Sequence, residues 1–223
     1  MLTQIPAYAI IVFILTVILT SILLVKALHA GKIVVLILLL WLVLNAILNL
    51  KGFYAETGTT PPHFIAAVAP PLLAILMVFI TAKGRSFAMQ ADLSMLTLLS
   101  IVRIPVELVL YWLYVAKAIP QLMTFAGRNF DIISGIAAIA VFFVCFKSKG
   151  IIHKRLLLAW NILGLILLLN IVINAVLSVP SPIQQFAFDQ PNIAVLYFPF
   201  TWLPCFIVPT VLFSHIISIK KLI

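Results

Sequence analysis

The sequence predicts an all-α, polytopic membrane protein: a seven-transmembrane-helix bundle that forms a single domain over residues 1–223. Three observations support this prediction. The 223 residues are 65% hydrophobic and only 9% charged, and the mean hydropathy of +1.30 lies far outside the range of soluble globular domains. Uncharged runs that recur along the chain are each long enough to cross a hydrocarbon core of roughly 30 Å as a helix. The connections are short, so we expect successive helices to be neighbours.

Seven spans account for the apolar runs. The predicted ranges are 5–25, 33–50, 63–82, 93–115, 130–146, 156–179 and 193–219. The first span lacks a basic n-region and a small-residue cleavage site, so we interpret it as a retained helix rather than a signal peptide. No segment is long and polar enough to be expected to fold as a separate soluble domain.

Basic residues predict the orientation, because cytoplasmic loops retain Lys and Arg during insertion. One set of alternate loops holds only Lys51, Lys117 and Arg128. The other set holds most of the basic residues: Lys26, Lys32, Lys83, Arg85, Lys147, Lys149, Lys154, Arg155, Lys220 and Lys221. We therefore expect the N-terminus outside and the C-terminus in the cytoplasm. This asymmetry also accounts for the net charge of +9 without a nucleic-acid partner.

The fourth predicted span carries ionisable residues in the middle of an apolar helix. Its polar residues are three or four positions apart, which places them on one face of the helix: Ser100, Arg103, Glu107, Tyr111 and Tyr114. A charge at bilayer depth is costly unless it is paired or faces a wet interior, so these residues are candidates for function. Arg103 and Glu107 are four residues apart and can pair along the helix. Pro105 lies between them and predicts a kink at the charges.

Three other spans have polar residues at a similar depth. Residues four positions apart on the second, sixth and seventh spans are Trp41, Asn45 and Asn49, then Asn170, Asn174 and Ser178, then Tyr197, Thr201 and Cys205. Together with Glu107 and Tyr111, we expect them to line one polar pocket that opens outward. The alternative is that these side chains only make hydrogen bonds between helices, and that Arg103 and Glu107 are a structural buried pair.

The predicted outer loops contain further candidate contact residues, namely His63, Arg128, Asp131 and Asp189. Arg128 and Asp131 are three residues apart at the start of the fifth span. We interpret them as a local pair at a helix N-terminus, where a carboxylate suits the helix dipole. Recognition of an outer ligand is the alternative for this pair.

Several classes of chemistry lack their signatures. A retinal protein needs a lysine within its last helix, and the seventh span has none before Lys220. The chain has no HExxH, GxSxG or Walker motif. Cys145 and Cys205 lie in different spans and form neither a disulfide framework nor a CxxC motif. The histidines, three of them near the predicted cytoplasmic boundary, lack a second ligand three or four residues away, so we predict no metal and no other cofactor.

Three short segments carry a resemblance to known sequences: RIPVE at 103–107, GRNFD at 127–131 and FDQPNIAVLYFP at 188–199. They are similar to an uncharacterised family of small seven-helix inner-membrane proteins from Bacteroidota-type bacteria. The resemblance extends over nearly the whole chain. It implies a location in the bacterial plasma membrane, and it implies no activity.

Two hypotheses for function come from different classes. In the first, the bundle binds or transports a small polar or anionic molecule through the outward-facing pocket, where Arg103 holds the polar group and Glu107 orients it or exchanges a proton. In the second, the protein is a non-catalytic scaffold or accessory subunit that binds a partner membrane protein through its outer loops. A membrane-embedded enzyme ranks third, because Glu107 and Arg103 can perform acid–base chemistry but no nucleophile or metal accompanies them. All three place the chain in a lipid bilayer.

Overall fold

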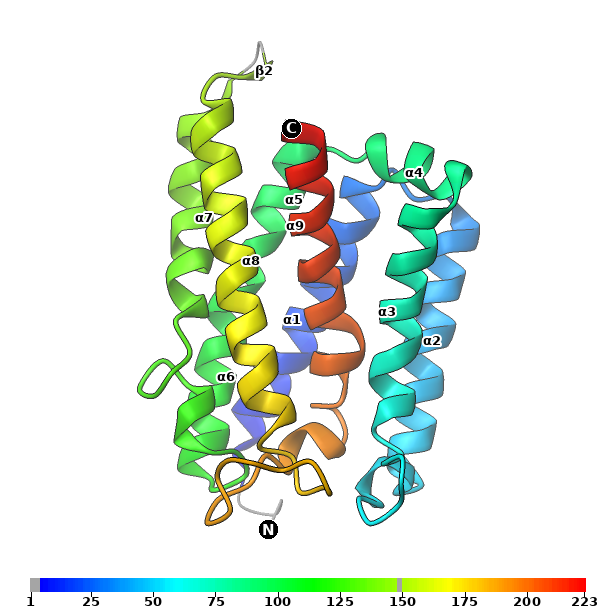
Figure 1. Ribbon diagram of the computed structural model, residues 1–223, viewed down its shortest axis with the longest axis vertical. Helices are drawn as coiled ribbons and strands as arrows, with labels where there is room; N and C mark the ends of the chain where they lie inside the picture. The colour runs from blue at the N-terminus through cyan, green and yellow to red at the C-terminus, as the bar shows by residue number, and fades with distance from the viewer. Residues whose placement is uncertain (1–4, 148–149) are drawn as a thin grey trace.

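The computed structural model describes residues 5–147 and 150–223, so Lys149, one of the basic residues that predict the orientation, lies outside the described residues. The described chain is helical apart from a small hairpin, and its long helices run up and down along one axis (Figure 1). They are α1 (Ala7–Ala27), α2 (Lys32–Leu50), α3 (Ile65–Ile80), α4 (Ala82–Met89), α5 (Leu93–Leu99), α6 (Arg103–Val115), α7 (Asp131–Cys145), α8 (Lys154–Val176) and α9 (Val208–Leu222). The hairpin pairs β1 (Phe146–Lys147) with β2 (Gly150–Ile151).

Five helical segments of the described chain are long and apolar enough to cross a membrane: α1, α2, Leu93–Val115, α8 and Leu203–Leu222. The bent pair α3 and α4 makes a sixth if it is counted as one span, and α7 is a shorter apolar helix. Each predicted span overlaps one of these segments. The helical, membrane-compatible architecture is therefore confirmed, whereas five or six segments, rather than seven, have the length and composition of a full span.

The third predicted span ends earlier than expected, because the chain bends by 94° after Ile80 and continues as α4 across the end of the bundle (Figure 1). Thr81 caps the start of α4, and its Oγ1 accepts a hydrogen bond from the backbone N of Gly84 at 3.1 Å. Arg85 donates from Nη1 to the carbonyl of Ile80 at 2.7 Å, which satisfies a group left free at the end of α3. A Cβ at Gly84 would lie 2.6 Å from Val78 Cα, so the turn requires a glycine.

The fourth predicted span has the expected extent, and it changes geometry next to its charges. α5 passes into a 3₁₀ turn at Ser100–Val102, and α6 begins at Arg103. Pro105 has no backbone N–H to donate to the carbonyl four residues earlier, so regular α-helical hydrogen bonding is interrupted at this point. The irregularity expected from Pro105 is thus a short 3₁₀ turn.

The last predicted span begins at Leu203 rather than near Ile193. The first turn of this helical segment, Leu203–Ile207, is π-helical and contains Pro204. The residues before Leu203 form a loop that is bonded to the bundle through its backbone. Ile193 N and Ala194 N both donate to Ala118 O, at 3.1 and 3.0 Å. Apolar composition alone does not distinguish such a buried loop from the start of a helix.

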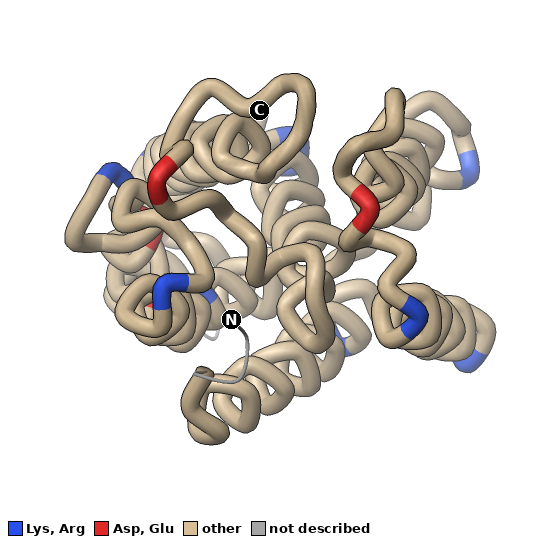
Figure 2. The backbone as a smooth tube through the Cα atoms, turned by 90° about the horizontal axis from the view of Figure 1, so that it is seen from below, with Lys and Arg blue, Asp and Glu red and all other residues tan. Residues whose placement is uncertain are grey.

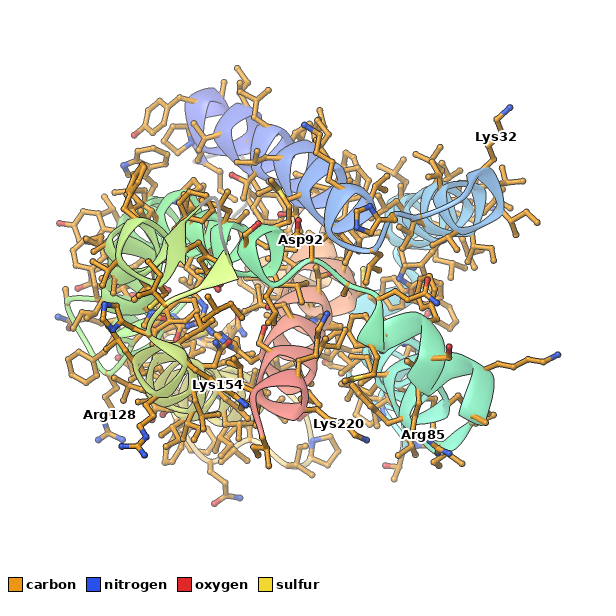
Figure 3. The ribbon with its side chains drawn as sticks, turned by 90° about the horizontal axis from the view of Figure 1, so that it is seen from above. Lys32, Arg85, Asp92, Arg128, Lys154 and Lys220 are labelled. Atoms are coloured by element: carbon orange, nitrogen blue, oxygen red, sulfur yellow. The ribbon has the colours of Figure 1, made fainter. Side chains whose placement is uncertain are left out.

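The two ends of the bundle differ in charge. At the end of the bundle where the C-terminus lies, the helix ends are basic. Helices α1, α2, α4, α8 and α9 contribute Lys26, Lys32, Lys83, Arg85, Lys154, Arg155, Lys220 and Lys221 there, and the acidic residue Asp92 lies beside them. Figure 3 looks onto this end and labels Lys32, Arg85, Asp92, Lys154 and Lys220. The opposite end has scattered charged positions of both signs (Figure 2). The basic residues that the sequence assigns to alternate loops therefore gather at one end of the folded chain.

α9 is the best-covered long helix, and α2 is the least covered. In the described structure 67% of the Leu203–Leu222 span is buried, compared with 17% of the α2 span. α9 packs chiefly on α8, and α8 packs on α7. The centre of the bundle, where a site shielded from lipid can form, thus lies among α6, α7, α8 and α9.

Candidate functional site

A cluster of charged side chains is buried where α6 meets α7 and α8. Arg103 and Glu107 project from α6 and are 3% and 1% exposed, and Asp131 at the start of α7 is 5% exposed. Arg103 Nη1 lies 3.7 Å from Asp131 Oδ1. Its other terminal nitrogen, Nη2, donates to the backbone carbonyl of Gly164 on α8 at 2.9 Å. One guanidinium therefore joins three helices.

The ion pair differs from both pairs expected from the sequence, since Arg103 faces Asp131 instead of Glu107, and Asp131 faces Arg103 instead of Arg128. The reason is the close approach of α6 and α7. Gly135 lies against α6 so tightly that a Cβ there would be 3.1 Å from Arg103 Cβ, and Asp131 is one helical turn away from Gly135. Arg128 instead lies over the ring of Phe186, 5.9 Å from its centroid.

Glu107 has an amide partner that sequence reasoning missed. Asn129, fully buried, donates from Nδ2 to Glu107 Oε1 and to Met123 O, the latter at 3.1 Å. Asn129 Oδ1 also accepts from the backbone N of Asp131 at 3.1 Å. This amide therefore holds the Glu107 carboxylate and the backbone at the start of α7, where Asp131 lies. Asn side chains commonly accept a hydrogen bond from the backbone N two residues later where a helix begins, and this signal could have identified Asn129.

The polar cluster continues along α8 and α9. His215 is fully buried, and its Nδ1 lies 2.9 Å from Asn161 Oδ1. Trp160 packs against the imidazole with ring centroids 5.6 Å apart. The sequence places His215 near the predicted cytoplasmic boundary, where a solvated side chain is expected. The structure instead places it inside the bundle, close to Gly164 and Ser134.

Many buried polar atoms of this cluster have no hydrogen-bond partner within the protein. They are Ser100 Oγ, Arg103 Nε, Glu107 Oε2, Ser134 Oγ, Trp160 Nε1 and His215 Nε2. Arg103 Nη1 and Asp131 Oδ1 also lack a hydrogen bond, but they face each other in the ion pair at 3.7 Å. Leaving one such group unsatisfied costs about 1–3 kcal/mol, and native proteins have only a few of them per 100 residues. Their concentration among four helices leaves them available for hydrogen bonds to water or to a bound molecule.

A cavity of about 90 Å³ adjoins the two carboxylates. Its polar lining consists of Glu107, Asp131 and Asn192, and the rest of its wall is apolar. A buried water needs roughly 10–15 Å³ on this measure, so several waters or a small molecule can fit. Phe64 and Val179, which also line it, lie just before the start of α3 and just after the end of α8. These helix ends are at the end of the bundle opposite the C-terminus (Figure 1).

A family model described as "Domain of unknown function (DUF8737)" matches residues 61–223, which is well over half of the chain. The chain belongs to this family. The expectation of an uncharacterised family is thereby confirmed, and the DUF8737 region contains α3 to α9 and hence the whole buried cluster. No curated protein and no solved structure matches the chain.

Asn45, Asn49 and Thr201 lie away from the cluster, in a hydrogen-bonded joint between α2 and the segment before α9. Asn45 accepts from Tyr54 Oη at 2.8 Å and donates to Trp41 O at 2.8 Å. Asn49 donates to Thr201 Oγ1 and to Leu196 O, the latter at 3.1 Å. Their polar groups are engaged with protein, and none of the three lines the cavity. The joint fastens α2, which lies before the DUF8737 region, to that region.

The remaining predicted pocket residues lie outside the cavity lining. Tyr111 and Tyr197 are both 36% exposed, and Tyr111 stacks on Phe125 with centroids 5.0 Å apart. Asn170 donates to Arg128 O at 2.8 Å, and Asn174 donates to Asn170 O at 2.8 Å. The structure therefore brings Arg103, Glu107 and Asp131 together and distributes the other predicted residues over separate contacts.

The outer-loop candidates show no shared site. His63 stacks on Phe53 with centroids 4.4 Å apart, and its Nδ1 lies 3.4 Å from Glu56 Oε2. Asp189 is exposed on the loop that follows α8. Over residues 5–147 and 150–223, no group of three or more His, Cys, Asp or Glu side chains is arranged to hold a metal ion.

Proposed function

We propose that this protein binds and transports a small polar molecule at the buried site formed by Arg103, Glu107 and Asp131. The observation that carries this proposal is the concentration of unpaired, buried polar atoms beside a cavity. Burying charged and polar groups in a membrane bundle costs free energy, and a ligand that completes their hydrogen bonds offsets that cost. A purely structural cluster gains nothing from leaving so many groups unsatisfied.

The proposal includes the topology. Seven segments cross the plasma membrane of a bacterium, with the N-terminus outside and the C-terminus in the cytoplasm. α3 and the 15-residue α7 then serve as short crossings. The basic end of the bundle supports this orientation, because it is the end expected to stay in the cytoplasm. The cavity, which lies toward the opposite end, then opens outward.

The lining of the cavity favours one of the two ligand classes expected from the sequence. Arg103 already faces Asp131, so its charge is largely compensated. The groups that line the cavity are the carboxylates of Glu107 and Asp131 and the side chain of Asn192. Two carboxylates repel an anion and accept hydrogen bonds from hydroxyl or amino groups. The proposed ligand is therefore a small molecule with hydrogen-bond donors at one end and an apolar remainder against the wall.

Binding is tested by native mass spectrometry of protein extracted gently from its own membrane, with a Glu107→Gln variant beside the wild type. We expect a reproducible small molecule on the wild type and its loss from E107Q. Glu56→Gln is the matched control, because Glu56 is exposed on a loop and its removal should leave the passenger in place. Uptake of the identified molecule into proteoliposomes then tests transport.

A different result would favour the accessory-subunit hypothesis. In that case the wild type carries no small molecule and arrives with a stoichiometric protein partner, and E107Q retains that partner. Substitution of the loop residues Phe186, Phe188 or Asp189 should then release it.

A further inference from the structure

The backbone at Gly164 borders a second polar subsite on the opposite side of Arg103 from Glu107. A Cβ built on Gly164 would lie 2.7 Å from His215 Cε1, 2.9 Å from His215 Nε2 and 3.0 Å from Ser134 Oγ. The imidazole nitrogen and the hydroxyl thus face the same small space from α9 and α7. Both atoms are buried and lack a partner in the protein. Arg103 reaches this space as well, through its bond to Gly164 O.

The hydrogen bonds of Asn161 define the tautomer of His215. Asn161 Nδ2 donates to Leu157 O at 2.9 Å, so the amide oxygen is the atom that faces His215 Nδ1. That oxygen can only accept, and Nδ1 therefore carries a hydrogen. The Nε2 atom of the neutral ring is left with a free lone pair, and it borders the same space at Gly164 as Ser134 Oγ. It can accept a hydrogen bond or a proton.

The order of residues along the helices links this subsite to the carboxylates. Ser134 lies three residues after Asp131 and thus on the same face of α7. Glu107 lies one turn beyond Arg103 toward the end where the cavity opens, and Asn161 lies nearly one turn before Gly164 toward the basic end. The sequence of groups through the bundle is therefore Glu107, then Asp131 with Arg103, and then Ser134 and His215.

Arg103 is the charged group nearest to His215. Among the elements packed on α9, α8 contributes Asn161 and Trp160, and α3 and α5 contain no ionisable side chain. The basic residues of α4 and of the start of α8, namely Lys83, Arg85, Lys154 and Arg155, lie at the basic end of the bundle, as do Lys220, Lys221 and Asp92. With neutral His215 and both carboxylates ionised, Arg103 leaves the cluster with a formal charge of −1.

We infer that Glu107, Asp131 and His215 share one exchangeable proton, which passes through the hydroxyl of Ser134, and that the proton is the coupling ion of this site. The shared proton makes the buried cluster neutral, which a low-dielectric interior favours. Ser134 Oγ has no hydrogen-bond partner in this structure, so the side chain must first turn to bridge the two groups. In the transfer, the O–H bond of a carboxylic acid then breaks and its proton moves to the Ser134 oxygen. The hydroxyl then gives its own proton to Nε2, so an imidazolium and a carboxylate form and Nδ1 keeps its hydrogen.

This inference rests on the proposed function in that the same carboxylates receive the ligand. It extends that function because His215 and Ser134, which do not line the cavity, are assigned to proton exchange. A donor ligand that binds at Glu107 and Asp131 favours their ionised forms, and it thereby moves the proton to His215. Linkage requires the reverse effect as well, so the position of the proton changes the affinity for the ligand.

The test is infrared spectroscopy of ligand-free protein in lipid nanodiscs across a pH titration, with ¹⁵N NMR of the histidine rings on the same samples. In the wild type, the protonated-carboxyl band and one imidazole are expected to titrate with shared midpoints, as coupled sites do. In His215→Gln, the carboxyl band at neutral pH is expected to rise about twofold if the proton is divided evenly in the wild type. His153→Gln, which removes an exposed histidine, should leave the band unchanged.

An identical carboxyl titration in H215Q and the wild type, with both proteins folded, overturns the relay. Ser134→Ala gives a second test if H215Q does not fold. It keeps both proton sites and removes the bridging hydroxyl, so deuterium exchange at the imidazole should slow several-fold, and an unchanged rate overturns the relay. If the protein binds a small polar molecule but its carboxyl band does not respond to His215→Gln, the proposed function stands and the relay is overturned. If the carboxyl band responds to His215→Gln in a protein that binds no polar molecule, the relay stands and the proposed function is overturned.

Discussion

Arg103 Nη2 and the carbonyl oxygen of Gly164 lie 2.9 Å apart and fasten α6 to α8 at the level of the buried charges. The bond depends on a residue without a side chain, because a methyl group at position 164 would occupy the space that His215 and Ser134 face. A contact of this kind makes local geometry, helix packing and the candidate site depend on one another.

Gly164→Ala should destabilise the protein by about 1–3 kcal/mol, the usual cost of overpacking a buried site. The added Cβ lies 2.7–3.0 Å from His215 and Ser134, so these side chains must move. Thermal unfolding in detergent measures the effect. Gly31→Ala is the control, since a Cβ at Gly31 meets nothing within 4 Å. Equal stability of G164A and the wild type would contradict the close packing of His215 and Ser134 against Gly164.

Arg103→Gln should destabilise the protein by about 3–5 kcal/mol, because it leaves the carboxylate of Asp131 buried without an opposite charge. The double variant R103Q with Asp131→Asn should lose less than the sum of the two single variants, since no unpaired charge remains. A double-mutant cycle on unfolding midpoints measures the coupling. The same cycle with Glu107→Gln should give a smaller value, and a larger one would favour the helical pair expected from the sequence.

Asn49→Ala should lower stability by about 1 kcal/mol, as expected for hydrogen bonds between helices in a membrane. It should leave ligand binding at the cluster unchanged, because Asn49 belongs to the separate joint with Thr201 and Leu196. Native mass spectrometry of the passenger measures the second part. Loss of the passenger from a folded N49A protein would instead support the single large pocket.

Asp92 predicts a pH dependence at the basic end. Burial alone would raise the pKa of Asp92, but hydrogen bonds from Ser94, through its side chain and backbone N, and from Met95 N hold the pKa below its ordinary value. A lowered folded pKa gives stability that is present above the unfolded value of about 3.9 and is lost as the pH falls through the folded value. Unfolding midpoints between pH 3 and pH 7 should therefore separate the wild type from Asp92→Asn only above about pH 4.

The matched control is Asp189→Asn, because Asp189 is an exposed carboxylate on the loop after α8. This variant should follow the wild type across the same pH range. A difference between wild type and D92N that grows as the pH falls would contradict the sign of the shift.

The sequence is sufficient to predict the helical class, the approximate segments and the polar face of α6. Arg103 and Glu107 are conspicuous because the residues around them are apolar, and this contrast needs no knowledge of neighbouring helices. The partners of Arg103 and Glu107 could not be predicted in the same way. Asp131, Asn129 and Gly164 lie on other elements, and the depth at which each element meets α6 depends on helix packing, to which the small residue Gly135 contributes.

His215 could not be placed for a related reason. Apolar residues fill 193–202 as densely as they fill the true helix, so the last span was predicted to begin too early and to end at residue 219. With α9 ending at Leu222, His215 sits two turns inside the bundle. Of the residues expected to share one pocket, only Glu107 lines the cavity, because equal spacing along three helices does not fix which way each helix is rotated.

α2 turns most of its surface to the bilayer, and its buried residues are Leu42, Asn45 and Asn49. This makes it a suitable place to attach a reporter. A fluorophore or spin label on its outer face, for example at Ile37 or Leu40, would sense lipid order and immersion depth while the charged interior stayed undisturbed. Measuring such labels one by one would map the hydrophobic thickness that surrounds the protein.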